Sequence, residues 1–189
     1  YRDGAYCIGL GMTAREQLLS FLAKAADPNS GGRQMPQHYG HKDLRIVSQS
    51  SPTGTQFLQA VGCAMVCKIG KTKEVVYVSA GEGTTSQGDF HEALNWASNA
   101  KAPVIFHIQD NEYAISTHRS EQTASSIYDM TSGYGNLSRY DVDGTDFFET
   151  SLAFKEAVQR ARRNKGPSII VTHVVRLLPH SSSDDQRKY

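Results

Sequence analysis

The sequence predicts an α/β fold built on a doubly wound parallel sheet. Three apolar runs of strand length, at residues 75–79, 104–108 and 168–175, alternate with segments whose apolar residues recur at helical spacing. Such alternation is typical of parallel strands joined by helical crossovers, and no internal repeat interrupts it. At 189 residues and 39% hydrophobic composition the chain can bury a core, so we expect a single domain over residues 1–189.

The first third is predicted to contain two helices separated by a long loop. Residues 13–16 (Thr-Ala-Arg-Glu) form a capping box, which marks the start of a helix. Four apolar side chains of that helix share one face: Leu18, Leu19, Leu22 and Ala25. The loop over residues 27–52 has little periodicity, and a loop of this length is uncommon unless it is functional. The second helix, residues 56–69, is rich in small residues and should pack closely against a neighbour.

The rest of the chain is predicted to alternate strands with helices. In order, we expect a strand at 75–79, a helix after Gly88, a strand at 104–108, an irregular segment over 116–138, a short strand at 139–142, a helix over 147–163 and a buried strand over 168–175. Gly166 and Pro167 break the last helix. Phe90 and Trp96 lie at helical spacing, which favours a place in the core over contact with a cofactor.

Composition excludes several classes of function. The net charge of +1 gives no reason to expect nucleic acid or a membrane surface as a partner, and no apolar run approaches the ~20 residues of a membrane span.

Cys7, Cys63 and Cys67 are odd in number and lack metal-site spacing. The last two lie four apart on an apolar helix, so we expect buried free thiols in a reducing compartment. Because the first residue is Tyr, we expect a fragment of a longer chain.

The most informative feature is an acid and an amide that follow two successive strands. Gly81-Glu82-Gly83 follows one apolar run, and Asn111 follows the next, with a predicted helix between them. Parallel strands joined by a helix end side by side, so Glu82 and Asn111 should meet. Magnesium prefers few protein oxygens and completes its shell with water and ligand phosphate. The glycines and the helix N-terminus favour close approach of a diphosphate. Gly-Glu-Gly alone fits an ordinary turn, but the joint pattern predicts a magnesium–diphosphate site.

This joint pattern resembles the thiamine-diphosphate motif, in which Gly-Asp-Gly is followed one strand–helix–strand unit later by Asn-Asn. Glu82 replaces the usual Asp and keeps the ligand type. Asp110 replaces the first Asn, which puts a further negative charge beside the metal. Gln109 stands where relatives often carry Arg, so one phosphate contact is lost or supplied elsewhere. The resemblance implies a thiamine-diphosphate-binding fold that holds thiamine diphosphate and Mg²⁺.

Further segments resemble the alpha subunits of branched-chain 2-oxoacid dehydrogenases (2-oxoisovalerate dehydrogenases), the thiamine-dependent decarboxylating component. The matching segments occur in the same order as in the family and extend along nearly the whole chain: residues 1–3, 32–40, 50–56, 113–117 and 180–185. Pyruvate dehydrogenase alpha subunits match fewer of them. The resemblance implies oxidative decarboxylation of a branched-chain 2-oxoacid with acyl transfer to a lipoyl group. Pyruvate or acetoin as substrate, or a non-catalytic diphosphate-binding module, remain alternatives. A nucleotide-binding domain is a weaker one, because its glycine-rich motifs are missing.

The resemblance also implies roles for individual residues. Magnesium would be held by Glu82, Asn111 and the backbone carbonyl of Tyr113. Cofactor contacts would come from Tyr1, Arg2, Ser51, Thr53, Gly81, Gly83, Thr84, Arg176 and His180. Arg176 and His180 follow a buried strand, at the sheet edge where the metal site should lie. His180 would be catalytic, by orienting the substrate carboxylate or assisting proton transfer.

Two loops carry further implied sites. A potassium-binding loop in the family matches Ser50, Pro52, Thr55 and Gln56. The same residues fit an N-cap and turn before the helix equally well. His38 and Tyr39 are candidates for lining the substrate entrance. Ser181 matches a serine that is phosphorylated in animal relatives, and a phosphate there would repel the cofactor diphosphate.

The resemblance implies partners as well. In the family, a glutamate from a second domain, carried by the beta subunit, assists activation of the cofactor, and nothing in this chain follows the pattern of that domain. We therefore expect half of an interfacial active site, completed by a beta-type subunit or a fused beta domain in a heterotetramer. A lipoyl-bearing acyltransferase would receive the acyl group. The location would be cytoplasmic in a bacterium and the mitochondrial matrix in a eukaryote.

Overall fold

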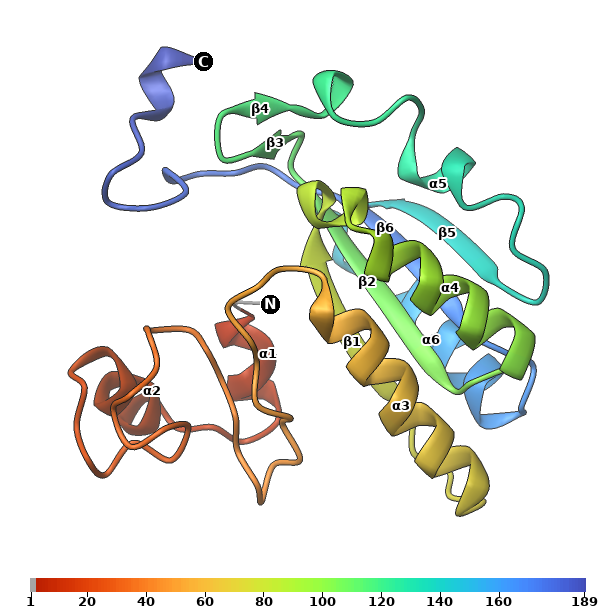
Figure 1. Cartoon of the computed structure of the whole chain (residues 1–189), viewed down its shortest axis with the longest axis horizontal. Coiled ribbons are helices and arrows are strands. Elements are labelled where there is room, and N and C mark those ends of the chain that lie inside the picture. The colour runs from red at the N-terminus through yellow and green to blue at the C-terminus, as the bar shows by residue number, and fades with distance from the viewer. Residues whose placement is uncertain (1–2) are drawn as a thin grey trace. The chain divides into compact units, whose positions relative to one another are not determined.

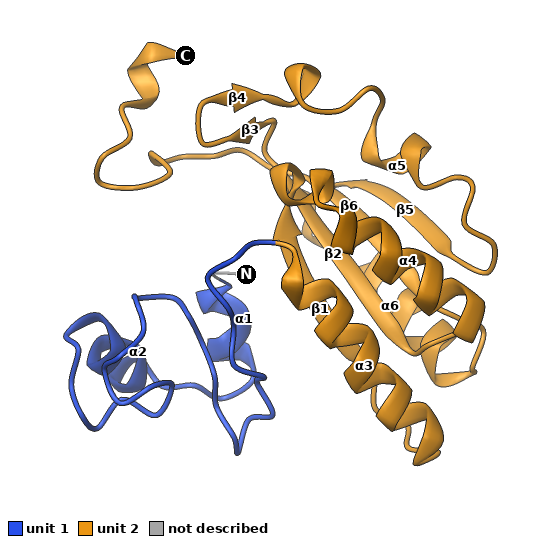
Figure 2. Ribbon diagram, in the orientation of Figure 1, with its two compact units in different colours: residues 1–53 blue, residues 54–189 orange. Residues whose placement is uncertain are grey.

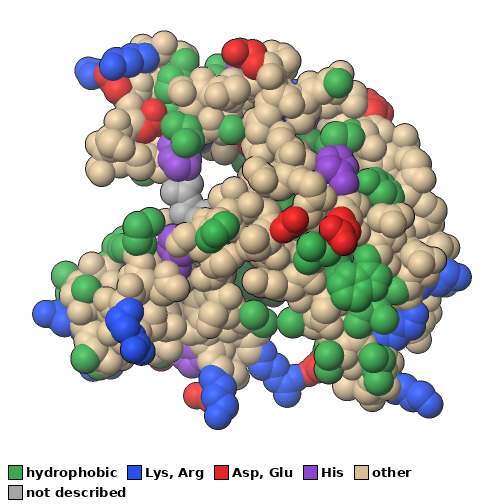
Figure 3. Space-filling model, viewed as in Figure 1, with side chains coloured by type: hydrophobic (Ala, Val, Ile, Leu, Met, Phe, Trp, Pro, Cys, Tyr) green, Lys and Arg blue, Asp and Glu red, His purple; other side chains and the backbone are tan. Residues whose placement is uncertain are grey.

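The computed structural model describes residues 3–189, which divide into two compact units. Unit 1 comprises residues 1–53 and unit 2 comprises residues 54–189 (Figure 2). Each unit is described below by itself, and the expectation of a single domain stays a prediction. None of the helices within residues 3–189 is long and apolar enough to cross a bilayer. On the face shown in Figure 3, the described Lys and Arg side chains lie in small separate groups, in keeping with the low net charge.

Unit 1 is built from two short helices and a long irregular loop. Helix α1 (Gly4–Gly9) precedes α2 (Ala14–Phe21), and the predicted capping box is present, because the Thr13 hydroxyl accepts a hydrogen bond from the Glu16 backbone N–H. The predicted apolar face of α2 is wrong. Its side chains at Leu18 and Leu22 are 59% and 62% exposed, and the helix ends at Phe21.

The small core of unit 1 is formed by residues from α1 and from the loop. Cys7, Met12 and Tyr39 are buried together, with Leu44 and Ile46 packed against them. The candidates for a substrate entrance, His38 and Tyr39, are only 4% and 2% exposed, so burial in this core argues against that role. Burial, with the charge of Asp3 adding to it, raises the pKa of the Cys7 thiol to about 11, so this thiol stays protonated and unreactive.

The long loop is ordered by a buried aspartate. The Asp27 carboxylate accepts hydrogen bonds from the backbone N–H groups of Asn29, Ser30 and Gly32 and from two side chains, over 2.8–3.2 Å. Although burial raises its pKa, these hydrogen bonds outweigh the effect and hold the pKa of Asp27 below its usual value. Gly32 has φ of +74°, and a Cβ there would lie 2.5 Å from the Ala23 carbonyl carbon. The turn therefore requires glycine at this position.

Unit 2 contains a four-stranded parallel sheet in the order β1-β2-β6-β5 (Figure 1). The strands are β1 (Val76–Gly81), β2 (Val104–Asp110), β5 (Ser138–Asp143) and β6 (Ser168–His173). In the register, Gly81 lies beside Gln109 and Asp110 lies beside His173, so the carboxyl ends of three strands meet at one edge. The predicted last strand is two residues too long, because the chain leaves the sheet after His173.

Helices cover both faces of this sheet, which confirms the doubly wound prediction. Helices α3 (Thr55–Ile69) and α4 (Gly88–Ala100) pack with α5 (Ile127–Met130) on one face, around Phe57, Phe90 and Phe106. Helix α6 (Phe147–Arg162) covers the other face, around Ala157 and Ile170. Asp146 caps α6 by accepting hydrogen bonds from two backbone N–H groups, and Arg160 and Arg162 in the last turn are favourable to the helix dipole.

Several side-chain predictions can be compared with this core. Phe90 is fully buried as predicted, but Trp96 is 41% exposed, so its predicted core position is wrong. The three cysteines are free thiols; Cys7 is buried, whereas Cys63 and Cys67 are only partly buried. A buried histidine in β2, His107, is held through both ring nitrogens. Its Nδ1 lies 2.7 Å from the Tyr77 hydroxyl and its Nε2 lies 2.9 Å from the Thr172 hydroxyl.

Short elements connect the strands and helices of unit 2, and some of them lie within residues 116–138, the segment predicted to be irregular. A 3₁₀ helix, η1 (Glu82–Ser86), lies between β1 and α4. After β2 the chain forms a small antiparallel hairpin of β3 (Tyr113–Ala114) and β4 (Thr117–His118), followed by η2 (Arg119–Glu121). The chain ends in η3 (Gln186–Lys188). These pieces gather at the carboxyl edge of the sheet and position the site described next (Figure 1).

Candidate cofactor site

Glu82 and Asn111 meet at the carboxyl edge of the sheet, as the sequence predicts. Strand β1 ends at Gly81 and η1 begins at Glu82, while β2 ends one residue before Asn111. The Asn111 backbone N–H donates a hydrogen bond to Glu82 Oε2 over 3.3 Å. The Glu82 side chain is buried with 2% of its surface exposed. This juxtaposition follows from the pairing of β1 with β2, because neighbouring parallel strands end together.

One oxygen of this buried carboxylate is unsatisfied. Within residues 3–189, Glu82 Oε1 has no hydrogen-bond partner. Burial raises the pKa of the Glu82 carboxyl, the charge of Asp110 adds to that, and backbone N–H groups of Glu82, Asn111 and Gly83 act in the opposite direction. An unpaired acceptor inside a protein calls for a ligand, and a cation would favour the ionised form.

The oxygen donors at this edge suit magnesium. Asn111 Oδ1 accepts one hydrogen bond, from the Tyr113 N–H over 3.0 Å, and has a second lone pair to offer. Within the described part of the chain, no group of three or more His, Cys, Asp and Glu side chains is arranged so that it could hold a metal ion. A metal here would therefore rely on one carboxylate, one amide and further oxygens from backbone and ligand, which is how Mg²⁺ is usually bound with phosphates. The residues at this edge therefore fit a Mg²⁺ ion bound together with a diphosphate, and their roles as ligands stay predictions.

The glycine after Glu82 allows the two halves of the site to touch. A Cβ on Gly83 would lie 2.5 Å from the Ala114 Cβ, so the η1 segment and the β3 strand approach more closely than any side chain permits. Gln122 Nε2 donates to the Gly83 carbonyl over 2.8 Å and holds this contact. Thr85, fully buried, closes the η1 turn by donating to the Glu82 carbonyl over 2.7 Å. Contacts of Gly81, Gly83 and Thr84 with a diphosphate stay predictions.

The negative charge of Asp110, which the sequence places beside the metal, is paired with a positive charge in the structure. Its carboxylate, 1% exposed, forms an ion pair with Arg119, which β4 and η2 bring back to the end of β2. Asp110 Oδ1 also accepts a hydrogen bond from the Glu112 backbone N–H over 2.9 Å. The expectation of a bare negative charge beside the metal is therefore corrected by a cation that the sequence pattern did not single out.

Arg176 and His180 lie beyond β6, at the same end of the sheet. The Arg176 guanidinium donates to the Ile115 carbonyl over 2.8 Å and to the Tyr189 hydroxyl over 2.5 Å, and lies 5.5 Å from the Tyr113 ring centroid. The His180 backbone N–H donates to Asp184 over 2.8 Å. The structure thus brings Arg176 to the β3–β4 hairpin, but its contacts are with protein groups, and the predicted phosphate and catalytic roles of Arg176 and His180 stay predictions.

The remaining predicted residues belong to unit 1, to the start of α3, or to the part of the chain that the structure does not describe. Tyr1 and Arg2 fall outside the described residues. Ser50, Ser51, Pro52 and Thr53 belong to unit 1, where the Ser50 hydroxyl donates to the Pro52 carbonyl over 3.4 Å. Thr55 and Gln56 begin α3 in unit 2, where Gln56 Oε1 accepts from the Gly54 N–H over 2.8 Å. The N-cap of α3 is Gly54, which makes no side-chain capping bond, and the potassium site stays a prediction.

Two residues of the site were missed by sequence reasoning, Arg119 and Gln122. Both lie in the segment predicted to be irregular, and each acts across a hairpin of two-residue strands. Strands that short leave no periodic signal, so only the Thr and Ile of residues 115–117 hinted at extended backbone.

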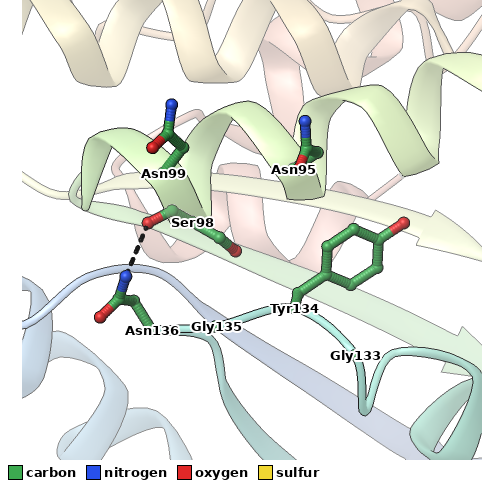
Figure 4. Close-up of a pocket in the computed structure, with 7 residues that line it drawn as sticks. All are labelled: Asn95, Ser98, Asn99, Gly133, Tyr134, Gly135 and Asn136. Carbon is green, nitrogen blue, oxygen red and sulfur yellow. Dashed lines mark hydrogen bonds between the residues drawn. The ribbon is translucent and has the colours of Figure 1, made fainter.

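A second, polar depression of about 310 Å³ lies beside the C-terminal half of α4 (Figure 4). Asn95, Ser98 and Asn99 of α4 line it together with residues 133–136, and Asn136 Nδ2 donates to the Ser98 carbonyl over 3.3 Å. Its seven lining residues include no acid, histidine or basic side chain. Among the described residues, Ser98 Oγ is buried here without a hydrogen-bond partner, but the charged groups and the unsatisfied Glu82 Oε1 lie at the opposite end of α4.

Comparison with known proteins decides the family. The family model described as "Dehydrogenase E1 component" matches residues 1–189. The chain belongs to the dehydrogenase E1 component family. It is 48% identical to the 2-oxoisovalerate dehydrogenase subunit alpha of Bacillus subtilis (strain 168), over 100% of this chain and 57% of that protein. The predicted resemblance to branched-chain alpha subunits is thereby confirmed.

Other relatives in the family carry the same name. The subunit alpha of Pseudomonas aeruginosa is 38% identical over 100% of this chain and 48% of its own length, and the human mitochondrial subunit alpha is 43% identical over 84% and 36%. The chain thus spans about half the length of these relatives, or less. Among solved structures, transketolase from Campylobacter jejuni aligns with a TM-score of 0.63 at 18% identity, over 78% of this chain and 24% of that one. This likeness shows the fold alone, a parallel sheet covered by helices as the sequence predicts.

Proposed function

We propose that this chain provides the thiamine-diphosphate- and magnesium-binding half of an active site for oxidative decarboxylation of a branched-chain 2-oxoacid. The observation that carries the proposal is the buried Glu82 carboxylate, which keeps one unsatisfied oxygen beside Asn111 at the ends of β1 and β2. The proposal is supported by the 48% sequence identity, over the whole of this chain, with an alpha subunit of 2-oxoisovalerate dehydrogenase.

In this proposal the residues at the carboxyl edge bind the diphosphate through a metal. Glu82 and Asn111 would hold Mg²⁺ through side-chain oxygens, with the Tyr113 carbonyl as a third ligand. The backbone N–H groups of Gly83 and Thr84 would bind diphosphate oxygens. When bound, thiamine diphosphate supplies a positively charged ring that accepts the electrons released with CO₂.

The segment after β6 would handle the substrate. Arg176 would contact a cofactor phosphate, which requires it to exchange a present protein partner for the ligand. His180 would orient the substrate carboxylate or move a proton at the reacting carbon, roles that suit an imidazole. The hairpin of β3 and β4 packs between this segment and η1, so its burial of the edge would help to exclude water.

The rest of the reaction would need partners. We propose a beta-type subunit or a fused beta domain as the source of the second half of the site, within a heterotetramer, and a lipoyl-bearing acyltransferase as the acceptor of the acyl group. The location would follow the source organism: cytoplasmic in a bacterium, and the mitochondrial matrix in a eukaryote, as the name of the human relative indicates for that protein.

Calorimetric titration of thiamine diphosphate with Mg²⁺ tests the binding half. The protein is titrated alone and with a beta-type subunit, beside Glu82→Gln, which keeps the shape of the side chain but removes its charge. Glu156→Gln, an exposed position on α6, is the matched control. We expect metal-dependent binding that tightens with the partner, is lost in Glu82→Gln and is unchanged in Glu156→Gln. Binding that ignores Glu82 would refute the assignment.

Turnover with a panel of substrates tests the reaction. With the beta-type partner present, we expect CO₂ release from 3-methyl-2-oxobutanoate to exceed that from pyruvate or acetoin. A preference for pyruvate or acetoin would move the chain to another branch of the family. Cofactor binding without turnover of any of the three would favour a non-catalytic module, and full activity of the protein alone would refute the half-site.

A further inference from the structure

The carboxylate of Asp110 is a buried charged group at the site that no proposed ligand role explains. It lies directly before Asn111 at the end of β2, and its side chain is 1% exposed. A buried carboxylate needs a counter-charge or hydrogen-bond donors, because water cannot solvate it. Left alone, it would also repel a diphosphate bound at the neighbouring residue, since like charges in a poorly solvated site interact strongly.

Arg119 provides this counter-charge through local backbone structure. The chain turns back after Tyr113, which pairs with His118, and the Arg119 backbone N–H donates to the Glu112 carbonyl over 2.8 Å. This geometry delivers the guanidinium to Asp110 Oδ2. The Arg119 side chain is 26% exposed, so it keeps some contact with solvent while the Asp110 side chain has almost none.

The other groups around Asp110 do not replace that charge. The Glu112 N–H donates to Oδ1, and Glu112 itself is an acid, 3.6 Å from Arg119. His173 Nδ1 lies 3.9 Å from Oδ2, but its Nε2 is 2.6 Å from Asp141, with which it would share any positive charge. Arg119 is the permanent cation within ion-pair distance of Asp110 among residues 3–189.

The same segment also reaches the other half of the site. Three residues beyond Arg119, Gln122 Nε2 donates to the Gly83 carbonyl over 2.8 Å. The Gln122 N–H in turn donates to the Arg119 carbonyl over 3.0 Å. Arg119 therefore contacts the residue that precedes Asn111. Through its hydrogen bond with Gln122, it is also linked to Gly83 in the turn after Glu82.

We propose that Arg119 is a positioning residue for the magnesium–diphosphate site, which neutralises Asp110 and keeps that carboxylate out of the metal shell. The proposal rests on the proposed function. The proposal predicts opposite effects on two ligands. Without Arg119, the unpaired negative charge of Asp110 should weaken binding of the diphosphate but strengthen binding of a divalent cation alone. A merely structural role would weaken the binding of both.

A double-mutant cycle tests this in the protein assembled with its beta-type partner. Arg119→Gln, Asp110→Asn, the double variant and Arg119→Lys are compared with Arg15→Gln, which removes an exposed positive charge in unit 1. Three quantities are measured: the Kd of thiamine diphosphate in saturating Mg²⁺ by calorimetry, the Kd of Mn²⁺ without thiamine diphosphate by electron paramagnetic resonance, and the melting temperature without ligands.

We expect Arg119→Gln to weaken thiamine diphosphate binding at least about tenfold, while Mn²⁺ binding is unchanged or tighter. Asp110→Asn and the double variant should bind thiamine diphosphate within about threefold of the wild type, because a neutral amide needs no counter-charge. Arg119→Lys should retain most of the affinity, and Arg15→Gln should have no effect.

Two results would overturn the inference while the proposed function stands. In the first, the wild type binds thiamine diphosphate and the Kd of Arg119→Gln is within twofold of the wild-type Kd. In the second, the double variant binds thiamine diphosphate no better than Arg119→Gln does. Parallel weakening of Mn²⁺ and thiamine diphosphate, with a lower melting temperature, would show a structural role only. If the wild type binds no thiamine diphosphate, the proposed function and this inference fall together.

Discussion

Gly83→Ala is expected to damage both the stability and the cofactor affinity of unit 2. The new Cβ would lie 2.5 Å from the Ala114 Cβ and 3.4 Å from the Ala114 Cα. Carbon atoms in contact ordinarily lie ~3.5–4.0 Å apart, so the two segments must separate by about 1 Å. Ala114 cannot yield freely, because it is paired within the β3–β4 hairpin and Gln122 ties that segment to the Gly83 carbonyl.

The magnitude follows from the cost of overpacking. Forcing an extra carbon into a packed contact destabilises proteins by about 1–3 kcal/mol, which we expect for the free energy of unfolding. Asn111 and Tyr113 precede Ala114 on the displaced segment, so the distance from Asn111 to Glu82 grows as well. A loss of about 1.4 kcal/mol in binding corresponds to a tenfold weaker Kd for thiamine diphosphate, and we expect at least that.

The measurements are urea unfolding followed by circular dichroism, and calorimetry with thiamine diphosphate and Mg²⁺. Gly88→Ala is the matched control, because nothing lies within 4 Å of a Cβ at that exposed first position of α4. It should change the unfolding free energy by no more than about 0.5 kcal/mol. A Gly83→Ala protein that matched this control in both measurements would refute the close-contact reasoning.

Three further predictions concern residues that are not themselves proposed metal ligands, although Glu112 lies between two of them. Asp27→Asn should destabilise the protein by about 1–3 kcal/mol in urea at pH 7, because several donors lose a charged acceptor. Since the folded-state pKa of Asp27 is lowered, its contribution is complete above the ordinary value of 3.8 and is lost as pH falls through the folded-state value. The wild type and the variant should therefore converge in stability at low pH, and a difference that persisted there would contradict this. His107→Leu should cost about 1–3 kcal/mol in the same assay, because the hydroxyls of Tyr77 and Thr172 lose their ring partner, and an unchanged midpoint would refute that role. Glu112 has φ of +70°, so Glu112→Gly should leave thermal stability equal or up to about 1 kcal/mol higher while Glu112→Val lowers it; the reverse order would argue against strain at this residue.

Much of unit 2 could be predicted because its pattern is local. The apolar runs and helical segments identified all four strands of the sheet and helices α3, α4 and α6 to within a few residues. The meeting of Glu82 with Asn111 followed from the rule that neighbouring parallel strands end together. Trp96 was misplaced because helical spacing alone does not show which face of α4 a neighbour covers.

The rest of the site depended on contacts that leave no periodic trace. Arg119 reaches Asp110 only because strands of two residues turn the chain back, and strands that short cannot be recognised by alternation. The exposed leucines of α2 failed for a related reason. An apolar face predicts burial, but Leu18 and Leu22 lie in a unit whose core is supplied by Cys7, Met12 and Tyr39.

The pairing of β1 with β2 has a consequence for the life of the protein in the cell. Glu82 and Asn111 are distant along the chain and come together only when α4 has packed and the two strands are aligned. A ligand that needs both residues can therefore bind only the folded state, and at a concentration 100 times its Kd it would add about 2.7 kcal/mol to the free energy of unfolding. The supply of that ligand would then govern how much of the protein is folded, as well as what fraction of it is loaded.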